Sequence, residues 1–417
     1  MHRRLALACL AAASGAALAQ APAQTPAAGA TVGLPDEVGQ SPYYLGVQQS
    51  ITYESNVYLA PKGTPKVSDS YGTTTFRAGI QRPISRQRAF ADAELRVSRY
   101  SDRSDLNNNG YALRAGVDWA TIGNLSGSVL FGANRSMSRL ATATLGSGTV
   151  RNVEHSEEIR AVGRLGGVTA LTFELGGDVR VVNFSERSLS DREYDRTGVH
   201  AAALYRLSSA TNVGLGVAAA KTDYRRDNSN RRDIYVTGQW TPSAITDVQA
   251  RLAATKIEYD VFTAQDFSGV TGSLVWNWRP TGKTAVSTFF ARDSGQDIGF
   301  LRLTPGQSVA AADFSTVTNA LGVRATYEAT PKILADAGLN WSRRNLANSF
   351  LPGQTTGRDT STVLTLGARY LATRNITVGC QVSREDRETL NDAGTSTAFT
   401  TRAANDILGC FGAFTIY

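Results

Sequence analysis

The chain has 417 residues, of which 19% are charged, and a formal net charge of +7. The charged fraction lies below the roughly 25% that is typical of soluble domains. The basic residues are scattered singly instead of forming a stripe, which argues against nucleic acid as a partner. With only three histidines in the chain, catalytic constellations are poor, and we expect neither an enzyme nor a cofactor.

The N-terminus has the three parts of a secretory signal peptide. A basic start at residues 2–4 precedes an apolar run at residues 5–17, and Ala-Leu-Ala at 17–19 forms a small-residue cleavage site. Residues 1–19 are therefore predicted to be a Sec-type leader. Residues 20–42 are rich in Ala, Pro, Gln and Gly and are predicted to be a disordered periplasmic segment. Beyond the leader, no run of about 18 apolar residues indicates a transmembrane helix.

From residue 43 onward the chain is a series of segments in which apolar and polar residues alternate. In residues 171–181, for example, Leu171, Phe173 and Leu175 alternate with Thr172 and Glu174. This period of two is that of a β-strand, and apolar residues three and four apart, as in a helix, are missing. Eighteen strands are predicted, or sixteen if one hairpin is miscounted: 43–54, 70–82, 88–100, 109–120, 124–136, 153–165, 169–184, 195–207, 211–224, 232–241, 246–259, 267–279, 283–293, 313–328, 332–345, 358–371, 375–387 and 400–417.

Short and long connections alternate strictly between these segments. The short ones, such as Pro280-Thr281-Gly282, are built from turn residues, whereas the long ones, such as 137–152, are polar loops. This pattern predicts an all-β protein: a transmembrane antiparallel up-and-down β-barrel at residues 43–417, with short periplasmic turns and long extracellular loops.

The last segment, Ala403 to Tyr417, ends the chain on an aromatic residue. Counting back by twos from Tyr417 gives a face of apolar or small residues that includes Phe411. An unpaired edge strand invites aggregation, whereas pairing with the first strand removes the edge. The ending resembles the signature strand of outer-membrane barrels, so the barrel-assembly machinery is an expected partner.

Aromatic residues gather near the ends of the predicted strands. Amphipathic rings favour the boundary between membrane and water, so two girdles are predicted. The residues assigned to them are Trp119, Tyr205, Trp240, Trp278, Tyr327, Trp341, Tyr370 and Tyr417.

Along each predicted strand, the residues that alternate with the apolar ones include most of the charged side chains. This polar face is predicted to line the lumen. Rings of charged side chains select what a pore passes, but Arg–carboxylate pairs across strands would also fill a wide polar wall, and both interpretations stay open. The slight excess of arginine hints at anionic solutes. The candidate lumen-lining residues are Arg77, Arg96, Arg114, Asp118, Glu158, Arg160, Glu174, Asp178, Arg180, Arg206, Arg251, Arg324, Asp336 and Arg369.

The remaining reactive side chains form no recognisable site. Neither His155 at a strand edge nor His200 in the lumen accompanies a nucleophile motif such as G-x-S-x-G, and no Cys/His cluster suggests a metal. Cys380 shares the parity of its outward-facing neighbours, whereas Cys410 has the parity opposite to Tyr417. This alternation predicts that the two thiols face opposite sides of the wall and do not bond.

Three short stretches in the first quarter carry a family resemblance. They are Ser50-Ile-Thr-Tyr-Glu-Ser-Asn-Val-Tyr58 and Ser68-Asp-Ser-Tyr71, followed by Arg86-Gln-Arg88. They resemble the β-barrel porin 2 type and, within it, the outer-membrane proteins encoded with exopolysaccharide operons, although Glu54 replaces the usual Asp. The resemblance implies a channel that passes or assists secretion of an exopolysaccharide across the outer membrane of a Gram-negative bacterium. The alternative is a general or small-solute diffusion porin. Expected partners are outer-membrane lipid and lipopolysaccharide, and under the first reading a secreted polysaccharide with other export components.

Overall fold

The computed structural model describes residues 42–417 apart from 61, 139–150, 167–168, 188–189, 191–192, 226, 262, 264–265, 295–314, 347–356 and 392–401. The predicted leader at 1–19, and all but the last residue of the predicted segment at 20–42, lie outside this range. Among the described residues, no helix is both long and apolar enough to cross a membrane.

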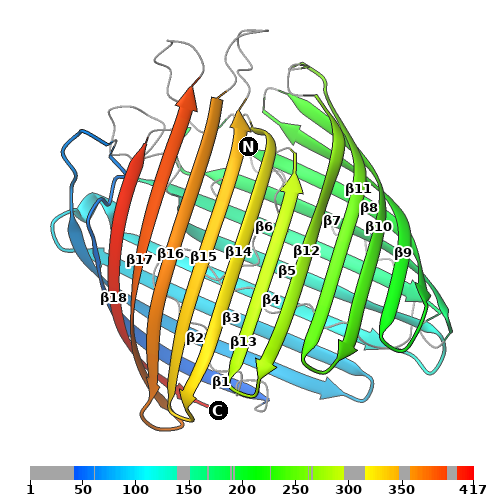
Figure 1. Ribbon diagram of the computed structural model, residues 1–417, viewed down its shortest axis with the longest axis horizontal. Coiled ribbons are helices and arrows are strands. Elements are labelled where there is room, and N and C mark those ends of the chain that lie inside the picture. The colour runs from blue at the N-terminus through cyan, green and yellow to red at the C-terminus, as the bar shows by residue number, and fades with distance from the viewer. Residues whose placement is uncertain are drawn as a thin grey trace.

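Eighteen strands make up most of the described chain, as predicted (Figure 1). They are β1 (Tyr43–Glu54), β2 (Asp69–Ile84), β3 (Gln87–Tyr100), β4 (Asn108–Ala120), β5 (Leu125–Ser138), β6 (Asn152–Leu165), β7 (Leu171–Phe184), β8 (Tyr194–Arg206), β9 (Thr211–Tyr224), β10 (Asn228–Ser243), β11 (Thr246–Tyr259), β12 (Phe267–Thr281), β13 (Thr284–Asp293), β14 (Ser315–Thr330), β15 (Ile333–Leu346), β16 (Gly357–Leu371), β17 (Ile376–Asn391) and β18 (Ala403–Ile416).

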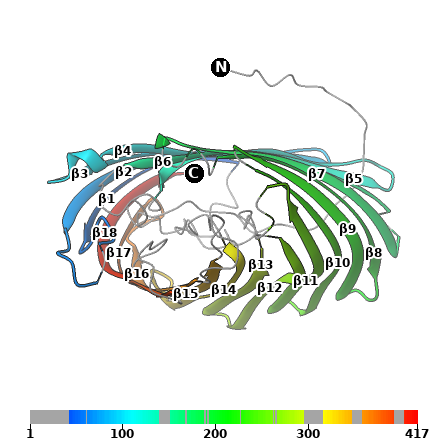
Figure 2. The same cartoon turned by 90° about the horizontal axis from the view of Figure 1, so that it is seen from above.

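The strands form one closed antiparallel sheet. Each strand pairs with its neighbours in sequence, and β1 pairs with β2 on one side and with β18 on the other. The closed wall is visible from above in Figure 2. In Figure 1 the near and far strands cross, as expected for strands that tilt against a barrel axis. Closure gives every strand two partners, so the strand backbones are hydrogen-bonded within the sheet without any contribution from water.

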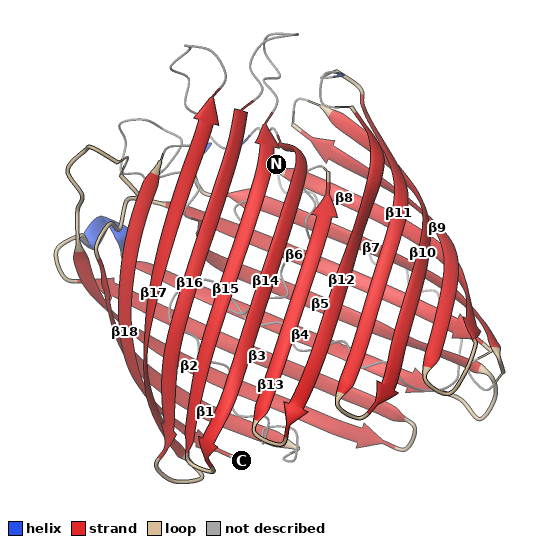
Figure 3. Ribbon diagram, viewed as in Figure 1, coloured by secondary structure: helices blue, strands red, loops and turns tan. Residues whose placement is uncertain are grey.

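The two faces of the wall differ in polarity. Outward-facing positions carry exposed apolar side chains, for example Leu175 at 68% exposure and Leu215 at 60%. The intervening residues face inward and are mostly polar, so the fold has no single hydrophobic core. An exposed apolar exterior around a closed barrel is the surface that a lipid bilayer requires. The barrel is therefore a transmembrane one, and its strand-rich composition is evident in Figure 3.

The loop after β1 covers the seam between β1 and β18. The backbone N–H of Asn56 donates to Asn405 Oδ1 at 2.9 Å, and Asn56 Nδ2 donates to the carbonyl oxygen of Ala404 at 3.2 Å. Asn405 Nδ2 in turn donates to Glu54 Oε2 at 3.3 Å. Both asparagines are 0% exposed, so these hydrogen bonds are shielded from water. We call this arrangement of Glu54, Asn56 and Asn405 the seam latch.

The prediction for the last strand was wrong in parity. Leu408, Phe414 and Ile416 face outward, whereas Phe411 is buried on the inner side. The assignment failed because small residues such as Gly409 and Gly412 occupy both faces, so that the alternation of polarity is weak there. Tyr417 lies beyond the last residue of β18 and does not define the strand's parity.

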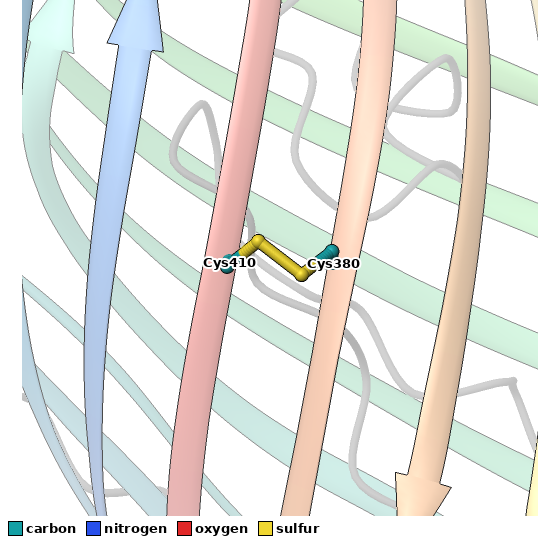
Figure 4. The surroundings of a disulfide bond; sticks show 2 residues. All are labelled: Cys380 and Cys410. Carbon is teal, nitrogen blue, oxygen red and sulfur yellow. A yellow bond between two sulfur atoms is a disulfide. The ribbon is translucent and has the colours of Figure 1, made fainter.

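As a consequence, the prediction for the cysteines was also wrong. Cys380 on β17 and Cys410 on β18 are direct partners in the sheet register, and both face outward. They form a disulfide with a Cα–Cα distance of 4.0 Å (Figure 4).

The disulfide predicts a specific labelling result. When the protein is unfolded in denaturant without reductant, a polyethylene-glycol maleimide should leave its gel mobility unchanged, because disulfide-bonded cysteines do not react with it. After reduction it should add two labels to a chain that lacks the predicted leader with Cys9, because Cys380 and Cys410 are then its cysteines. Two labels without reductant would contradict the bond.

The seam latch predicts a stability loss for Asn405→Ala. The change leaves the buried N–H of Asn56 without its acceptor and removes one of the hydrogen bonds that Glu54 accepts, which should cost about 2 kcal/mol of the free energy of unfolding. Urea titration in detergent, followed by gel mobility of the unheated protein, measures this. Asn124→Ala, at an exposed turn position, is the matched control and should change it by less than about 0.5 kcal/mol.

The ionic inner wall as candidate functional site

All of the predicted lumen-lining residues occupy inward-facing positions of their strands. The exposure pattern alternates along each strand, and these residues share the parity opposite to the exposed apolar side chains. They do not form one ring. The sheet register instead gathers most of them, with neighbours that the sequence did not flag, into four clusters around the wall and one more exposed group.

The first cluster joins β2 and β3 near the seam. The carboxylate of Glu94 accepts a hydrogen bond from Arg77 Nε at 2.9 Å and lies 3.1 Å from Arg96 Nε. All three side chains are buried. Two guanidinium groups thus share one carboxylate. Because all three groups are buried, this cluster stabilises the wall and does not present a binding surface.

Below this cluster, toward the short turns, lies a more exposed group. Arg88 Nη2 is 2.5 Å from Asp118 Oδ2, and both side chains are 41% exposed. The guanidinium groups of Arg88 and Arg114 both lie over the ring of Phe90, at 5.4 and 5.1 Å from its centroid. Contacts of this kind keep a cation in place while leaving it accessible to solvent.

The second cluster spans β6, β7 and β8. Glu174 accepts a hydrogen bond from Arg164 Nε at 2.6 Å and lies 3.4 Å from His200 Nε2. Asp178 pairs with Arg196 of the next strand. Arg160, which pairs with Glu158 at 2.7 Å, is the most accessible of these charges, with 51% of its side chain exposed.

The third cluster, on β10 to β13, is centred on Asp233. Its carboxylate accepts hydrogen bonds from Arg231 Nε at 3.1 Å, Arg251 Nη2 at 3.2 Å and Thr255 Oγ1 at 2.7 Å. The guanidinium of Arg251 lies over the ring of Tyr235, 4.2 Å from its centroid. Of these residues only Arg251 was predicted.

Arg231 was not among the predicted residues because the predicted strand began at residue 232, whereas β10 begins at Asn228. Asp233 and Tyr235 were inside the predicted strand but were not assigned to a face. The alternation of Arg231, Asp233 and Tyr235 with the apolar Ile234 and Val236 is the signal that could have identified all three.

The fourth cluster, on β14 to β16, is centred on Asp336. Arg369 donates to it twice, from Nε to Oδ2 at 2.8 Å and from Nη2 to Oδ1 at 3.0 Å. Thr326 Oγ1 also donates to Oδ1, at 2.9 Å, while Arg324 lies 3.6 Å away. Arg369 is 7% exposed, so its pairing with this carboxylate is shielded from water.

The two histidines cannot share a site. His200 belongs to the inner wall, whereas His155 faces outward near the loop end, where its Nδ1 is 3.1 Å from the hydroxyl of Tyr111 and its Nε2 is 3.1 Å from Glu157. Among the described residues, no group of three or more His, Cys, Asp or Glu side chains could hold a metal ion.

The predicted girdle aromatics lie mainly at one end of the barrel. Trp119, Tyr205, Trp240, Trp278, Tyr327 and Tyr370 are all among the last residues of strands that run into short turns, and Tyr417 follows β18 at the same end. Trp341 alone lies toward the loop end, opposite Leu321 and Thr362. The structure therefore places these residues in one girdle, with Trp341 as the exception, where two were predicted.

Comparisons with known proteins give no family. No family model matches the chain, and no curated protein matches it in sequence, so the resemblance to exopolysaccharide-operon proteins gains no support. Among solved structures, the chain is similar to Pseudomonas aeruginosa OpdO, with 11% identity over 90% of this chain and 96% of that one and a TM-score of 0.46. It is also similar to Acinetobacter baumannii OccAB3, with 9% identity over 90% and 99% and a TM-score of 0.48. It is similar as well to the outer membrane protein opdK from Pseudomonas aeruginosa, with 10% identity over 90% of this chain and 98% of that one and a TM-score of 0.45. At such low identities and TM-scores, neither a family nor a solute follows from the likeness.

The fourth cluster predicts a graded effect of removing carboxylates. Asp336→Ala deprives the nearly buried Arg369 of two hydrogen bonds and should lower the free energy of unfolding by about 3 kcal/mol. Asp118→Ala removes the partner of Arg88 in a pair that is 41% exposed, so it should cost no more than about 1 kcal/mol. Urea titration followed by tryptophan fluorescence measures both. Equal losses would show that burial does not distinguish the two pairs.

Proposed function

We propose that this protein is a diffusion channel for small polar and charged solutes in the outer membrane of a Gram-negative bacterium. The observation that carries the proposal is the closed wall of eighteen strands with an apolar outside and an ionic inside. A barrel of this strand number is wide enough to leave an aqueous interior, whereas about eight strands are filled by their own side chains.

The outer-membrane location is supported by the architecture and by the predicted leader. A bilayer admits only helices and closed barrels, because backbone groups that lack partners are costly in hydrocarbon. Bacterial single-chain barrels have an even number of strands with both ends on the periplasmic side. Here Tyr43 at the start of β1 and Ile416 at the end of β18 lie at the short-turn end, which is the expected periplasmic side.

Solute passage is supported by the accessible part of the inner wall. Arg88, Asp118 and Arg160 present charge of both signs with a large exposed fraction, while the more buried pairs compensate each other within the wall. Weak contacts at several points allow a solute to enter and to leave, whereas one tight site would retain it. Mixed charge favours broad passage of polar solutes with a modest preference for one sign.

Secretion of an exopolysaccharide is the weaker alternative, because the residues that carried the resemblance have structural roles. Asn56 and Glu54 form the seam latch, and Tyr71 donates to Glu54 Oε1 at 2.9 Å. Asp69 accepts hydrogen bonds from the backbone N–H groups of Ser70 and Arg103, at 2.7 and 2.9 Å. Glu54 and Asn56 thus hold the seam and Asp69 holds the loop after β3, which are structural roles that need no sugar polymer.

Planar-bilayer recording tests the channel. The purified protein should produce discrete conductance steps, and Arg160→Glu should shift the reversal potential in a salt gradient toward cation selectivity, because it replaces an accessible positive charge on the inner wall. Arg82→Glu, on the outer face near the short turns, is the matched control and should leave it unchanged. Absence of conductance in the unmodified protein would refute the proposal.

A polymer test separates the two functions. If the protein passes an exopolysaccharide, the polymer should block its conductance, and deletion of the gene should trap polymer in the periplasm. A diffusion channel for small solutes predicts neither result, but predicts slower uptake of small polar solutes by the deletion strain.

A further inference from the structure

We propose that the outer face of β13 to β16, at the loop end, binds the phosphate groups of a phosphorylated glycolipid in the surrounding leaflet. This inference rests on the outer-membrane location given above, but not on passage of any solute. The proposed site consists of Arg292, Asn319, Arg343, Thr360 and Arg358, and we call it the arginine row.

The sheet register places four of these residues side by side. Arg292 pairs with Asn319, Asn319 with Arg343, and Arg343 with Thr360, on four consecutive strands. Arg358 follows one outward position further toward the loops, where it pairs with Asn345. All of these side chains share the outward parity of Phe290, Leu321 and Leu364 on their strands.

The outward face of this part of the wall carries positive charge only. Among the described residues of β12 to β16, every charged side chain with outward parity is an arginine: Arg292, Arg343 and Arg358. This face ends at β17, where Glu388 is the register partner of Thr360, and where Asp386 and Glu388 lie 2.8 and 4.0 Å from Lys62 Nζ. Elsewhere on the barrel, outward lysines near the loops pair with acidic residues, as Lys221 does with Asp223 and Lys256 with Glu258, both at 2.7 Å.

The arginines have unused donor capacity. Arg292 donates from Nε to the carbonyl oxygen of Val270 and from Nη1 to Asn319 Oδ1, both at 3.1 Å. Within the described part of the chain, the guanidinium groups of Arg343 and Arg358 form no hydrogen bond or ion pair. Guanidinium presents a planar fork of donors that fits phosphate oxygens, and Asn319 and Thr360 add groups that can bind further oxygens or sugar hydroxyls.

The row lies at the height where lipid headgroups are expected. Tyr370 marks the girdle at the short-turn end of β16, ten residues from Thr360 on the same face. At about 3.3 Å per residue this is roughly 33 Å along the strand. A tilt of about 40° reduces it to roughly 25 Å across the membrane, which matches the height of a barrel's apolar band. Trp341, one outward position below Arg343, has the placement of an interfacial aromatic.

These observations select the occupant. The charge of the row is complementary to an anion, its height matches a headgroup, and the exposed apolar side chains below it, such as Phe290 and Leu364, provide a surface for acyl chains. A lipid with phosphate and sugar hydroxyls in its headgroup satisfies all three conditions. A free anion would use only the first.

Lipid binding can be measured with the full-length mature protein in nanodiscs of phosphatidylcholine. Addition of purified lipopolysaccharide should raise the unfolding temperature of the wild type. Arg343→Gln should weaken binding by about tenfold, because it removes a charged hydrogen-bond donor from the site. Arg99→Gln, which alters an outward cation on β3 that bonds its own hairpin, is the matched control and should bind as the wild type does.

The remaining arms decide the source of the phosphate. Dephosphorylated lipopolysaccharide should bind the wild type as weakly as intact lipopolysaccharide binds Arg343→Gln, and inorganic phosphate should not reproduce the thermal shift. An equal shift with inorganic phosphate, or equal binding by Arg343→Gln and Arg99→Gln, overturns the inference. Conductance of the wild type in bilayers free of lipopolysaccharide tests the channel separately, so that either proposal can fail without the other.

Discussion

The pairing of β1 with β18 is the constraint on which the rest of the structure depends. An open sheet of this length would expose the backbone groups of two edge strands to hydrocarbon, which a bilayer does not tolerate. Once the seam is closed, the register determines whether each side chain of the wall faces the lipid or the interior. The polarity of both faces, the placement of the aromatic girdle and the clustering of inward charges all follow from this alternation of side-chain direction.

Closure also explains why the interior is built from ion pairs instead of a hydrophobic core. Inward positions on neighbouring strands lie close enough for direct contact, and a wide barrel has no opposite wall near enough to cover them. Charges of opposite sign on adjacent strands, such as Glu94 with Arg77, therefore stabilise each other locally. The more exposed pairs keep the surface wet, and so one set of interactions supports both the wall and the proposed passage of solutes.

The sequence was sufficient to predict the fold because the signal is repeated eighteen times. Alternating polarity identified the strands, and strict alternation of short and long connections identified the meander. Parity also placed every predicted charged residue on the inner face. It failed on β18, where glycine and alanine on both sides leave the outward direction undefined, and this error separated Cys380 from Cys410. The clusters themselves were not predictable, because the pairing of Asp233 with Arg251 or of Asp336 with Arg369 depends on the stagger between strands, which a single strand does not encode.

The seam latch has a consequence for biogenesis. Asn56 and its partner Asn405 are separated by 349 residues, so the latch remains incomplete until β1 and β18, at the two ends of the barrel, have been brought together. A chain arrested before that moment has the β1–β2 loop but no surface on which it can dock. The loop is thus placed to fasten the seam after the two edge strands have paired and to oppose its reopening.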